Sequence, residues 1–349
     1  MNEMNTVNQD FIQIFKLFFD DEPIEIESKN TSHGESDFRE VILYKCNSGK
    51  KYVIKLADNS FTFADKIEMW RRCAEEYRNY GYYCPSIIRS KSDNFPSVSY
   101  KGHNCIVYAE EYSVYRSAED FDKSGLQYKG YFDDALIMTA KVASSQFNFT
   151  DYPSGNCLFE CFCPDDNYDE VMENALEWRR YADTLPSEFR KQTQRIWNRW
   201  IDNRDLLETL YGRLPTSVFQ ADLNPSNILL DDHGKFVGVY DFNLCGKDVF
   251  LNYLFREIYR GNYEEELKSI LSALKTVSRV YKFSDIEKTA APLLYRCIKP
   301  LWFTRVQDLK EAGDKNETIK KHLDETEIAQ TRTIDFSFYM SANTDYSSL

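Results

Sequence analysis

The pattern of apolar and polar positions divides the chain into a strand-rich part and a helical part. In the first 112 residues, short runs of partly alternating apolar residues predict strands. These runs are residues 23–28, 39–46, 50–56, 96–101 and 105–112. Apolar residues at steps of three and four predict one helix within 1–20 and another over 64–81, where Gly81 is a typical end. We therefore expect an antiparallel sheet with one main helix in a lobe of residues 1–112.

From residue 113 onward the apolar spacing is mostly helical. Long patterns with a period of 3.6 residues predict helices at 133–147, 169–185 and 187–211 and again beyond 250. Two short strands interrupt them, at 227–231 and 235–242, and the turn Asp231-Asp232-His233-Gly234 joins them. Residues 336–349 are expected to form a loose tail. The whole pattern predicts an α+β fold with an N-terminal lobe, 1–112, and a mostly helical C-terminal lobe, 113–349.

Composition narrows the classes of function. The formal net charge of −13 and the pI of about 5.0 disfavour binding to nucleic acid, because such a surface repels phosphate backbones. No run of 18 apolar residues and no secretory start are found, so we expect a cytoplasmic protein with no membrane partner. The nine scattered cysteines are expected to be reduced thiols. Cys157, Cys161 and Cys163 could bind a metal, but their alternation with apolar residues favours packing.

Two acids and an amide, in the segment FQADLNPSNILLDDHGKFVGVYDFNL, have the spacing of a catalytic centre. Asp222 and Asn227 lie five residues apart on a loop that runs into the first short strand. The second strand returns and brings Asp241 beside them. Phosphoryl transfer from a nucleotide needs such a set, because an acid orients the attacking hydroxyl and oxygen ligands hold Mg²⁺. We therefore assign Asp222 as the catalytic base, and Asn227 and Asp241 as metal ligands.

The pattern D-x-N-P-x-N followed by D-F-N resembles the catalytic segment of the aminoglycoside phosphotransferase and choline kinase family. That family consists of small-molecule kinases with a protein-kinase-like fold, and the resemblance implies ATP and Mg²⁺ as cofactors. The sequence departs from the family pattern in two places. Phe242 and Asn243 follow the metal acid, which is closer to the protein-kinase D-F-G than in many relatives. Gln220 stands where the family usually has a histidine two residues before the catalytic acid. In the resemblance that histidine is mainly structural and hydrogen-bonds the loop backbone, which a glutamine can also do.

The N-terminal lobe should then supply the nucleotide-binding residues. Lys55 in the strand KYVIKLAD resembles the lysine of the V-A-I-K strand, which contacts the α- and β-phosphates. Its glutamate partner is expected on the next helix, where Glu68 and Glu75 lie seven residues apart, and Glu75 is slightly preferred.

Two further segments of this lobe are expected to touch the nucleotide. The loop SKNTSHGESDF should lie over the phosphates; it contains no G-x-G-x-x-G, so the resemblance points to Ser36 and nearby backbone amides. Residues 107–113 look like the hinge, where the backbone around Glu110 and Tyr112 would meet the adenine and their side chains would matter little.

The acceptor is the open part of the function. Residues 151–177 hold eight acidic residues and no Lys or Arg, which suits an amine-bearing substrate such as an aminoglycoside, an amino sugar, choline or an amino alcohol. The alternative is a solvated acidic loop. Trp178, Trp197 and Trp200 could enclose a quaternary amine, although their helical spacing is more typical of a core.

Two other functions compete with a small-molecule kinase. A protein kinase is disfavoured because no A-P-E segment follows Asp241. A regulatory pseudokinase is disfavoured because a protein without transfer activity has no need of Asp222. The sequence leaves the oligomeric state and the choice between ATP and GTP open.

Overall fold

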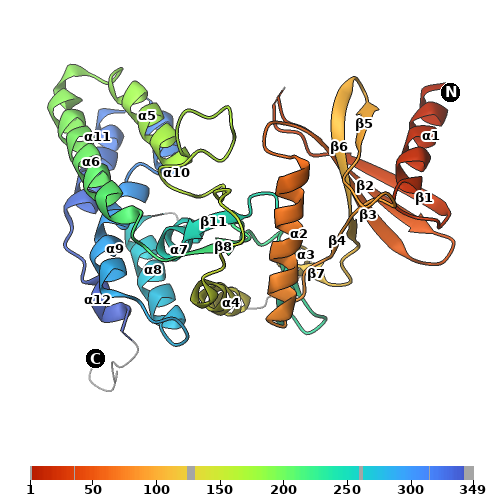
Figure 1. The fold of residues 1–349 in the computed structure, drawn as a ribbon. Helices are drawn as coiled ribbons and strands as arrows, with labels where there is room; N and C mark the ends of the chain where they lie inside the picture. The colour runs from red at the N-terminus through yellow and green to blue at the C-terminus, as the bar shows by residue number, and fades with distance from the viewer. Residues whose placement is uncertain (1, 35, 124–129, 259–261, 314, 342–349) are drawn as a thin grey trace. The chain divides into compact units, whose positions relative to one another are not determined.

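The computed structural model describes residues 2–34, 36–123, 130–258, 262–313 and 315–341, drawn in Figure 1. Contacts divide the chain into two compact units. The first contains residues 1–131, 163–165 and 222–246, and the second contains 132–162, 166–221 and 247–349. No single cut in the sequence separates these units, so the lobe boundary at residue 112 stays a prediction.

The main sheet of the first unit is built as the alternating pattern predicted. Strands β1 (Pro23–Asn30), β2 (Phe38–Cys46) and β3 (Lys51–Asp58) form an antiparallel meander. Strand β6 (His103–Glu111) pairs with β3 and also with β4 (Ile87–Ile88) and β5 (Ser97–Tyr100). The two-residue strand β4 was not predicted, because two residues carry no detectable alternation.

Two helices lie against opposite faces of this sheet (Figure 1). Helix α1 (Asn2–Lys16) packs Phe11, Ile14 and Phe15 against the buried side chains of β2. This confirms the helix predicted from their spacing. Helix α2 (Ala64–Asn79) covers the other face with a buried stripe that includes Trp70 and Tyr77, and it ends just before Gly81, whose φ is +84°.

A second small sheet in the first unit carries the predicted catalytic segment. Its strands are β7 (Arg116–Ser117), β9 (Ile228–Leu230) and β10 (Phe236–Val239), in the order β10-β9-β7, with α3 (Ala118–Lys123) beside it. The predicted turn joins β9 and β10. There the Asp231 carboxylate accepts the N–H groups of His233 and Lys235, and Gly234 has a φ of +75°.

The second unit is mostly helical, as predicted. Its helices are α4 (Tyr131–Ser145), α5 (Glu170–Ala182), α6 (Arg190–Tyr211), α7 (Phe250–Glu257), α8 (Tyr263–Val277), α9 (Asp285–Ile298), α10 (Phe303–Glu311), α11 (Asn316–Thr331) and α12 (Phe336–Tyr339). A single 3₁₀ turn, Ser187–Phe189, precedes α6, and a two-stranded sheet joins β8 (Thr216–Phe219) to β11 (Gly246–Val249). None of the helices among these described residues could span a membrane.

The prediction of a loose tail from residue 336 is wrong at its start. Phe336 is buried and its ring lies 5.7 Å from that of Phe255 and 5.9 Å from that of Tyr295, while Met340 is also buried. The short run FSFYM gave no helical period, but its apolar side chains complete the core of the second unit. Residues 342–349 of the predicted tail lie outside the described part of the chain.

Candidate active site

The loop that carries Asp222 is held by its own hydrogen bonds. Ala221, just before the acid, has a φ of +65°, a left-handed backbone that costs a residue with a side chain roughly 1–3 kcal/mol. The amide nitrogen of Asn227 donates to Asp222 Oδ2 at 2.8 Å and to the Asp222 carbonyl at 3.3 Å. The predicted acid and amide therefore converge, and Asn227 fixes the carboxylate.

A tight strand contact places Asp241. Tyr83 forms a bridge to Gly238 of β10, with hydrogen bonds from Tyr83 N to the Val237 carbonyl and from Val239 N to the Tyr83 carbonyl. A Cβ on Gly238 would lie 1.8 Å from the Tyr83 carbonyl oxygen, so this position requires glycine. Strand β10 is thereby fixed just before Asp241, which has a φ of +61°. Both predicted functional acids thus lie at or beside left-handed backbone.

One hydrogen bond and one ring contact tie the Asp241 segment to the rest of the site. Tyr240 N donates to the Asn227 carbonyl at 3.1 Å, which brings the two metal-ligand candidates together. Phe242 is buried, and its ring makes an edge contact with that of Tyr77 on α2, with the centroids 5.8 Å apart. The segment after β10 is therefore anchored on both sides.

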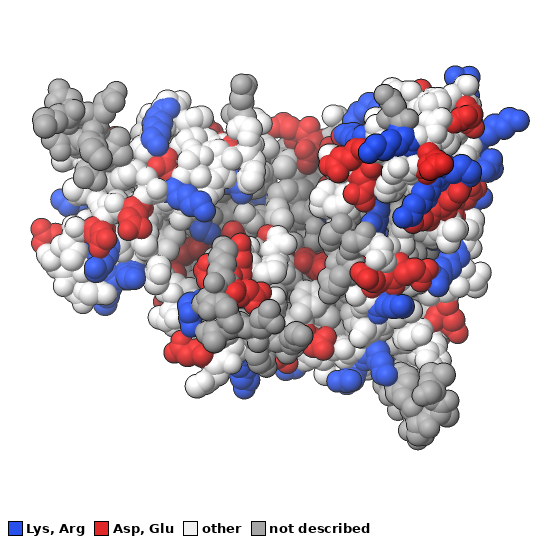
Figure 2. Space-filling view, turned by 180° about the vertical axis from the view of Figure 1, so that it is seen from behind, with Lys and Arg blue, Asp and Glu red and all other residues white. Residues whose placement is uncertain are grey.

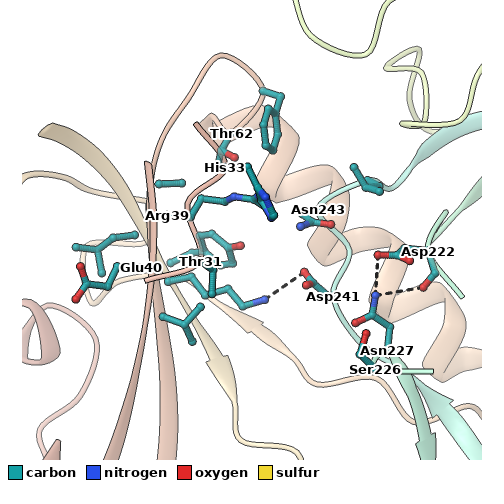
Figure 3. Close-up of a pocket in the computed structure, with 17 residues that line it drawn as sticks. Thr31, His33, Arg39, Glu40, Thr62, Asp222, Ser226, Asn227, Asp241 and Asn243 are labelled. Atoms are coloured by element: carbon teal, nitrogen blue, oxygen red, sulfur yellow. Dashed lines mark hydrogen bonds and ion pairs between the residues drawn. The ribbon is translucent and has the colours of Figure 1, made fainter. Parts of the chain in front are cut away.

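Lys55 points from β3 toward these acids, as the resemblance implied. Its Nζ lies 3.3 Å from Asp241 Oδ1 and 3.1 Å from Glu110 Oε1 (Figure 3 draws the first contact). The position of Glu110 beside Lys55 follows from the register between β3 and β6. Val53 pairs with Glu110 and Lys55 with Tyr108, so the lysine and the glutamate are diagonal neighbours on one face of the sheet.

The prediction that Glu75 pairs with Lys55 is wrong for this structure, and Glu68 does not take its place. Glu75 is 52% exposed and lies 3.6 Å from Arg71 on its own helix. Glu68 pairs with Arg71 and Arg89. Both glutamates are satisfied by arginines, and the carboxylate beside Lys55 comes from the neighbouring strand.

These residues border a cavity of about 400 Å³ that lies entirely in the first unit (Figure 3). That volume lies within the range of roughly 300–1,000 Å³ typical of ligand pockets. Its lining includes the predicted residues Lys55, Asp222, Asn227 and Asp241. The sequence reasoning missed its other polar members, which are Thr31, His33, Arg39, Glu40, Thr62, Ser226 and Asn243.

Three other predicted nucleotide-binding residues do not line this cavity. Ser36 is exposed at the tip of its loop, where Thr31 and His33 border the cavity in its place. Glu110 has a buried side chain bound to Lys55, so the expectation that its side chain matters little is wrong. Tyr112 is 39% exposed, with Lys51 Nζ 4.7 Å from its ring centre. Contact of the 110–112 backbone with adenine stays a prediction.

Burial and neighbouring charges have competing effects on the pKa values of the site residues. Burial raises the pKa of Asp222 to about 6, and the nearby Asp241 carboxylate acts in the same direction, against hydrogen bonds from Asn224 and Asn227. Burial by itself would lower the pKa of Lys55, but Asp241 and Glu110 together raise it, so the lysine stays charged. Burial also raises the pKa of Glu110. Two acids that repel each other beside a charged lysine favour a cationic species between them.

The donor set fits a hard cation with a polyphosphate. The amide nitrogen of Asn227 is used on Asp222, so its oxygen is the atom left to join the Asp241 carboxylate as a ligand. Two buried polar atoms of lining residues, Arg39 Nε and Asn243 Oδ1, have no hydrogen-bond partner. Buried polar atoms are normally paired, so these two indicate that a polar ligand belongs in the cavity.

No group of three or more His, Cys, Asp and Glu side chains suited to a metal ion occurs within the described ranges. The three neighbouring cysteines therefore form no metal centre there. Cys157 is buried, Cys161 is exposed and Cys163 is half-buried. All nine cysteines lie in the described part of the chain and are free thiols.

The acidic segment 151–177 carries more structural carboxylates than expected. Four of its eight acids form ion pairs with basic residues from elsewhere in the second unit. These pairs are Asp151–Lys247, Asp169–Arg204, Glu170–Arg256 and Glu177–Lys310. On the face drawn in Figure 2, basic groups are interspersed among the acidic ones.

The tryptophans of the second unit form part of its core. Trp178 and Trp200 are fully buried. Trp200 Nε1 donates to the Cys297 carbonyl at 2.8 Å, and the Trp197 and Trp200 rings are stacked 5.7 Å apart. Gln220, which stands where the family usually has a histidine, is also fully buried. The core interpretation of Trp178 and Trp200 therefore holds, and no amine cage is formed by them.

Comparison with known proteins supports this reading of the site. A sequence model of the phosphotransferase enzyme family matches residues 131–252, which include Asp222, Asn227 and Asp241. This match confirms the resemblance to small-molecule phosphotransferases found in the motif, and it supports small-molecule kinase activity. No curated protein sequence matches the chain.

Solved structures share the fold at low sequence identity. A microcompartment-associated aminopropanol kinase is similar with a TM-score of 0.55 and 13% identity, over 93% of this chain and 95% of the other. An amicoumacin kinase in complex with AMP-PNP, Ca²⁺ and Ami gives 0.54 and 15%, over 97% and 99%. An aminoglycoside phosphotransferase from Alicyclobacillus acidocaldarius gives 0.52 and 12%, over 92% of each chain. The predicted α+β, protein-kinase-like fold is confirmed.

Proposed function

We propose that this chain is a Mg·ATP-dependent phosphotransferase that transfers the γ-phosphoryl group to a hydroxyl of a small, amine-bearing molecule. The observation that carries the proposal is the convergence in one cavity of Lys55, the hydrogen-bonded pair Asp222–Asn227, and Asp241 3.3 Å from the lysine. These are the positions that a nucleotide-dependent phosphotransferase needs.

Each residue has a chemical role in this proposal. Bound ATP would supply the phosphoryl group, and Mg²⁺ would neutralise the charge that develops during transfer. Asp241 and the amide oxygen of Asn227 hold the cation, while Lys55 contacts phosphate oxygens and is itself positioned by Glu110. Asp222 orients the acceptor hydroxyl and takes its proton on a carboxylate oxygen that Asn227 holds by a hydrogen bond.

The exposed acids of segment 151–177 carry the assignment of the acceptor. Three acids of 151–177 take part in none of the ion pairs given above, and all three are exposed: Glu160, Asp165 and Glu173. Their charge favours an amine in the substrate. The fold neighbours include an aminopropanol kinase and aminoglycoside phosphotransferases, which agrees with that class.

The first experiment measures thermal stability with Mg·ATP and with Mg·GTP, for the wild type and for Asp241→Ala. A nucleotide at about 100 times its dissociation constant stabilises the protein by roughly 2.7 kcal/mol, which raises the unfolding midpoint by several degrees. We expect a Mg-dependent shift in the wild type, and no such shift in Asp241→Ala. Asp232→Ala, at an exposed residue of the neighbouring turn, is the matched control and keeps the shift.

The second experiment tests transfer. ADP release is followed with a panel of amino alcohols, amino sugars and aminoglycosides, each beside the analogue in which the amine is absent. Turnover with the amines and not with their analogues supports the full proposal. Turnover with the analogues contradicts the amine assignment alone. Nucleotide binding without turnover on any acceptor supports a regulatory role, and no binding of either nucleotide contradicts the proposal as a whole.

A further inference from the structure

An arginine outside the predicted site lies on the same face of the sheet as Lys55. Arg39 pairs with Ala57 across β2 and β3, and Val41 pairs with Lys55. Since side chains alternate along a strand, Arg39 and Lys55 project on the same side as diagonal neighbours. The burial of β2 agrees, because Phe38, Glu40 and Ile42 are buried on the opposite side while Arg39 is partly open. Diagonal neighbours are separated by roughly 7–8 Å, so two long cationic side chains can reach one phosphate chain.

The Arg39 guanidinium is oriented and not fully used. Its Nη2 lies 2.8 Å from Asp37 Oδ2, and Asp37 Oδ1 accepts a hydrogen bond from Asn59 at 2.9 Å. The backbone around it is closed by hydrogen bonds from Arg39 N to Ser32 Oγ and from Thr31 N to the Arg39 carbonyl. Its Nε is buried and has no hydrogen-bond partner. An arginine has five N–H donors, so the Asp37 pair leaves donors for a ligand.

The Arg39 side chain is directed into the cavity. Figure 3 shows Arg39 extending from the sheet toward the segment of Asp241 and Asn243. Burial raises the pKa of Tyr108, and Lys55 and Arg39 both act in the opposite direction, as two cations near the same wall do. The loop before Arg39 contains one glycine, Gly34, and no G-x-G-x-x-G pattern, and its Ser36 is exposed. Arg39 therefore supplies a side-chain cation to a cavity whose covering loop has no glycine-rich pattern.

We infer that Arg39 is a second phosphate-binding residue, which holds the β- and γ-phosphates of the nucleotide opposite Lys55. The inference rests on the proposed function, because it needs a nucleoside triphosphate in this cavity. Guanidinium groups match phosphate oxygens with two parallel hydrogen bonds, which an ammonium group cannot do. Asp37 keeps the Arg39 guanidinium group oriented when no ligand is bound. The residue therefore selects triphosphate over monophosphate.

The experiment compares affinities for ATP, ADP and AMP, each with Mg²⁺, in the wild type, Arg39→Gln, Arg39→Lys and Arg71→Gln. Arg71 is the matched control because it is a partly exposed arginine that pairs with carboxylates on α2 and does not line the cavity. We expect Arg39→Gln to weaken ATP by about tenfold to a hundredfold, since hydrogen bonds to charged groups are worth that much. ADP should lose less, AMP should stay within about twofold, and Arg39→Lys should fall between the wild type and Arg39→Gln.

The same measurements can overturn the inference. Equal weakening of ATP, ADP and AMP by Arg39→Gln would mean that Arg39 only shapes its loop, and unchanged binding of all three would mean that it has no role. In either case the wild type still binds nucleotide, so the proposed function survives. A wild type that binds none of the three overturns both. If Arg39→Gln does not fold, as judged by its thermal midpoint, Arg39→Lys decides alone. A larger loss for ATP than for AMP supports the inference, and an equal loss contradicts it.

Discussion

Acidic residues play different parts in the two units of the molecule. In the first unit Asp222 and Asp241 border a cavity, burial and the nearby Asp241 carboxylate raise the pKa of Asp222, and Lys55 Nζ lies 3.3 Å from Asp241. In the second unit Asp169 is buried against Arg204 and caps the N-terminus of α5, where its carboxylate accepts the Met172 N–H at 2.9 Å. The first arrangement is costly without a ligand, whereas the second is complete within the protein.

This difference distinguishes acids that take part in function from acids that stabilise the fold. The segment 151–177 is the most acidic stretch of the chain, and at least four of its acids are bound to basic residues. The catalytic segment is less conspicuous in composition, but its acids keep unbalanced charge in a concave site. Unbalanced charge, and not the number of acids, marks the functional site.

The largest expected effect comes from removing the acid that takes the proton. Asp222→Asn should lower the rate of transfer by about 10²–10⁴-fold, because an amide cannot accept the hydroxyl proton. Nucleotide affinity should stay within about twofold, since Asp222 is assigned no contact to the phosphates. ADP release in single-acceptor assays measures the first quantity, and nucleotide titration measures the second. Asp232→Asn is the control, and transfer at the wild-type rate by Asp222→Asn would contradict the assignment.

The next effect tests the structural half of the comparison. Asp169→Ala removes one partner of a buried ion pair and the cap of α5, so the free energy of unfolding should fall by about 3–5 kcal/mol. Denaturant unfolding of the variant measures this loss. Glu173→Ala, an exposed acid on the same helix, should change stability by less than about 0.5 kcal/mol. Equal changes in the two variants would show that the acidic segment is uniformly solvated.

Sequence reasoning identified the active acids better than it identified their partners. Asp222, Asn227 and Asp241 follow from local spacing, since one loop and one hairpin bring them together. The contact of Lys55 with Glu110 depends on the register between two strands that are far apart in sequence, which no local pattern encodes. The alternation of β2 does place Arg39 on the Lys55 face, so that signal was present and was overlooked.

The same limit applies to the acidic segment. Three of its counter-charges, Arg204, Arg256 and Lys310, come from three other helices of the second unit. Composition of a segment cannot reveal a partner that only the fold supplies. The helices themselves were predictable, because their apolar period is local and long. The short helix after residue 336 was not predictable in this way, because it depends on packing against Phe255 and Tyr295.

A third acid sharpens the comparison because hydrogen bonds hold it without a close cation. Asp248 is buried and accepts hydrogen bonds from Ser154, Tyr211, Asn252 and the Val249 N–H. Burial nevertheless raises its pKa from 3.8 to about 6. The folded state therefore binds the proton more tightly than the unfolded state does. The stability from this group is fully present below pH 3.8 and is lost as the pH rises through about 6.

The size of that loss can be measured by difference. Two pKa units correspond to about 3 kcal/mol, so wild-type stability relative to Asp248→Asn should fall by up to about 3 kcal/mol between pH 4 and pH 7. The amide cannot titrate, and other acids cancel in the comparison. Denaturant unfolding at several pH values provides the data. A difference that does not vary with pH would show that the hydrogen bonds hold Asp248 ionised throughout, as in the ion-paired acids.

The smallest effect concerns Glu110, which shares features with the structural acids and with the acids of the cavity. Glu110 is buried and paired like Asp169, yet its partner is the lysine of the cavity. Glu110→Gln keeps the shape and loses the charge, so Lys55 should turn toward Asp241 and compete with the cation. We expect the KM for Mg·ATP to rise about tenfold, equivalent to about 1.4 kcal/mol, with a smaller change in kcat. Glu75→Gln is the control, because its helix position is where the family resemblance placed the partner.

The pair of variants decides which glutamate positions the lysine. A rise in KM for Glu110→Gln alone supports the strand glutamate as the positioning residue, and extra Mg²⁺ should then restore part of the lost affinity. A rise for Glu75→Gln alone would mean that α2 moves when nucleotide binds and that Glu75 replaces Glu110 in the working state. Glu110 then stabilises only the ligand-free arrangement, in which Lys55 lies between two carboxylates at 3.1 and 3.3 Å. In that case an acid that looks functional by position is structural by role, and unbalanced charge alone would no longer separate the two kinds.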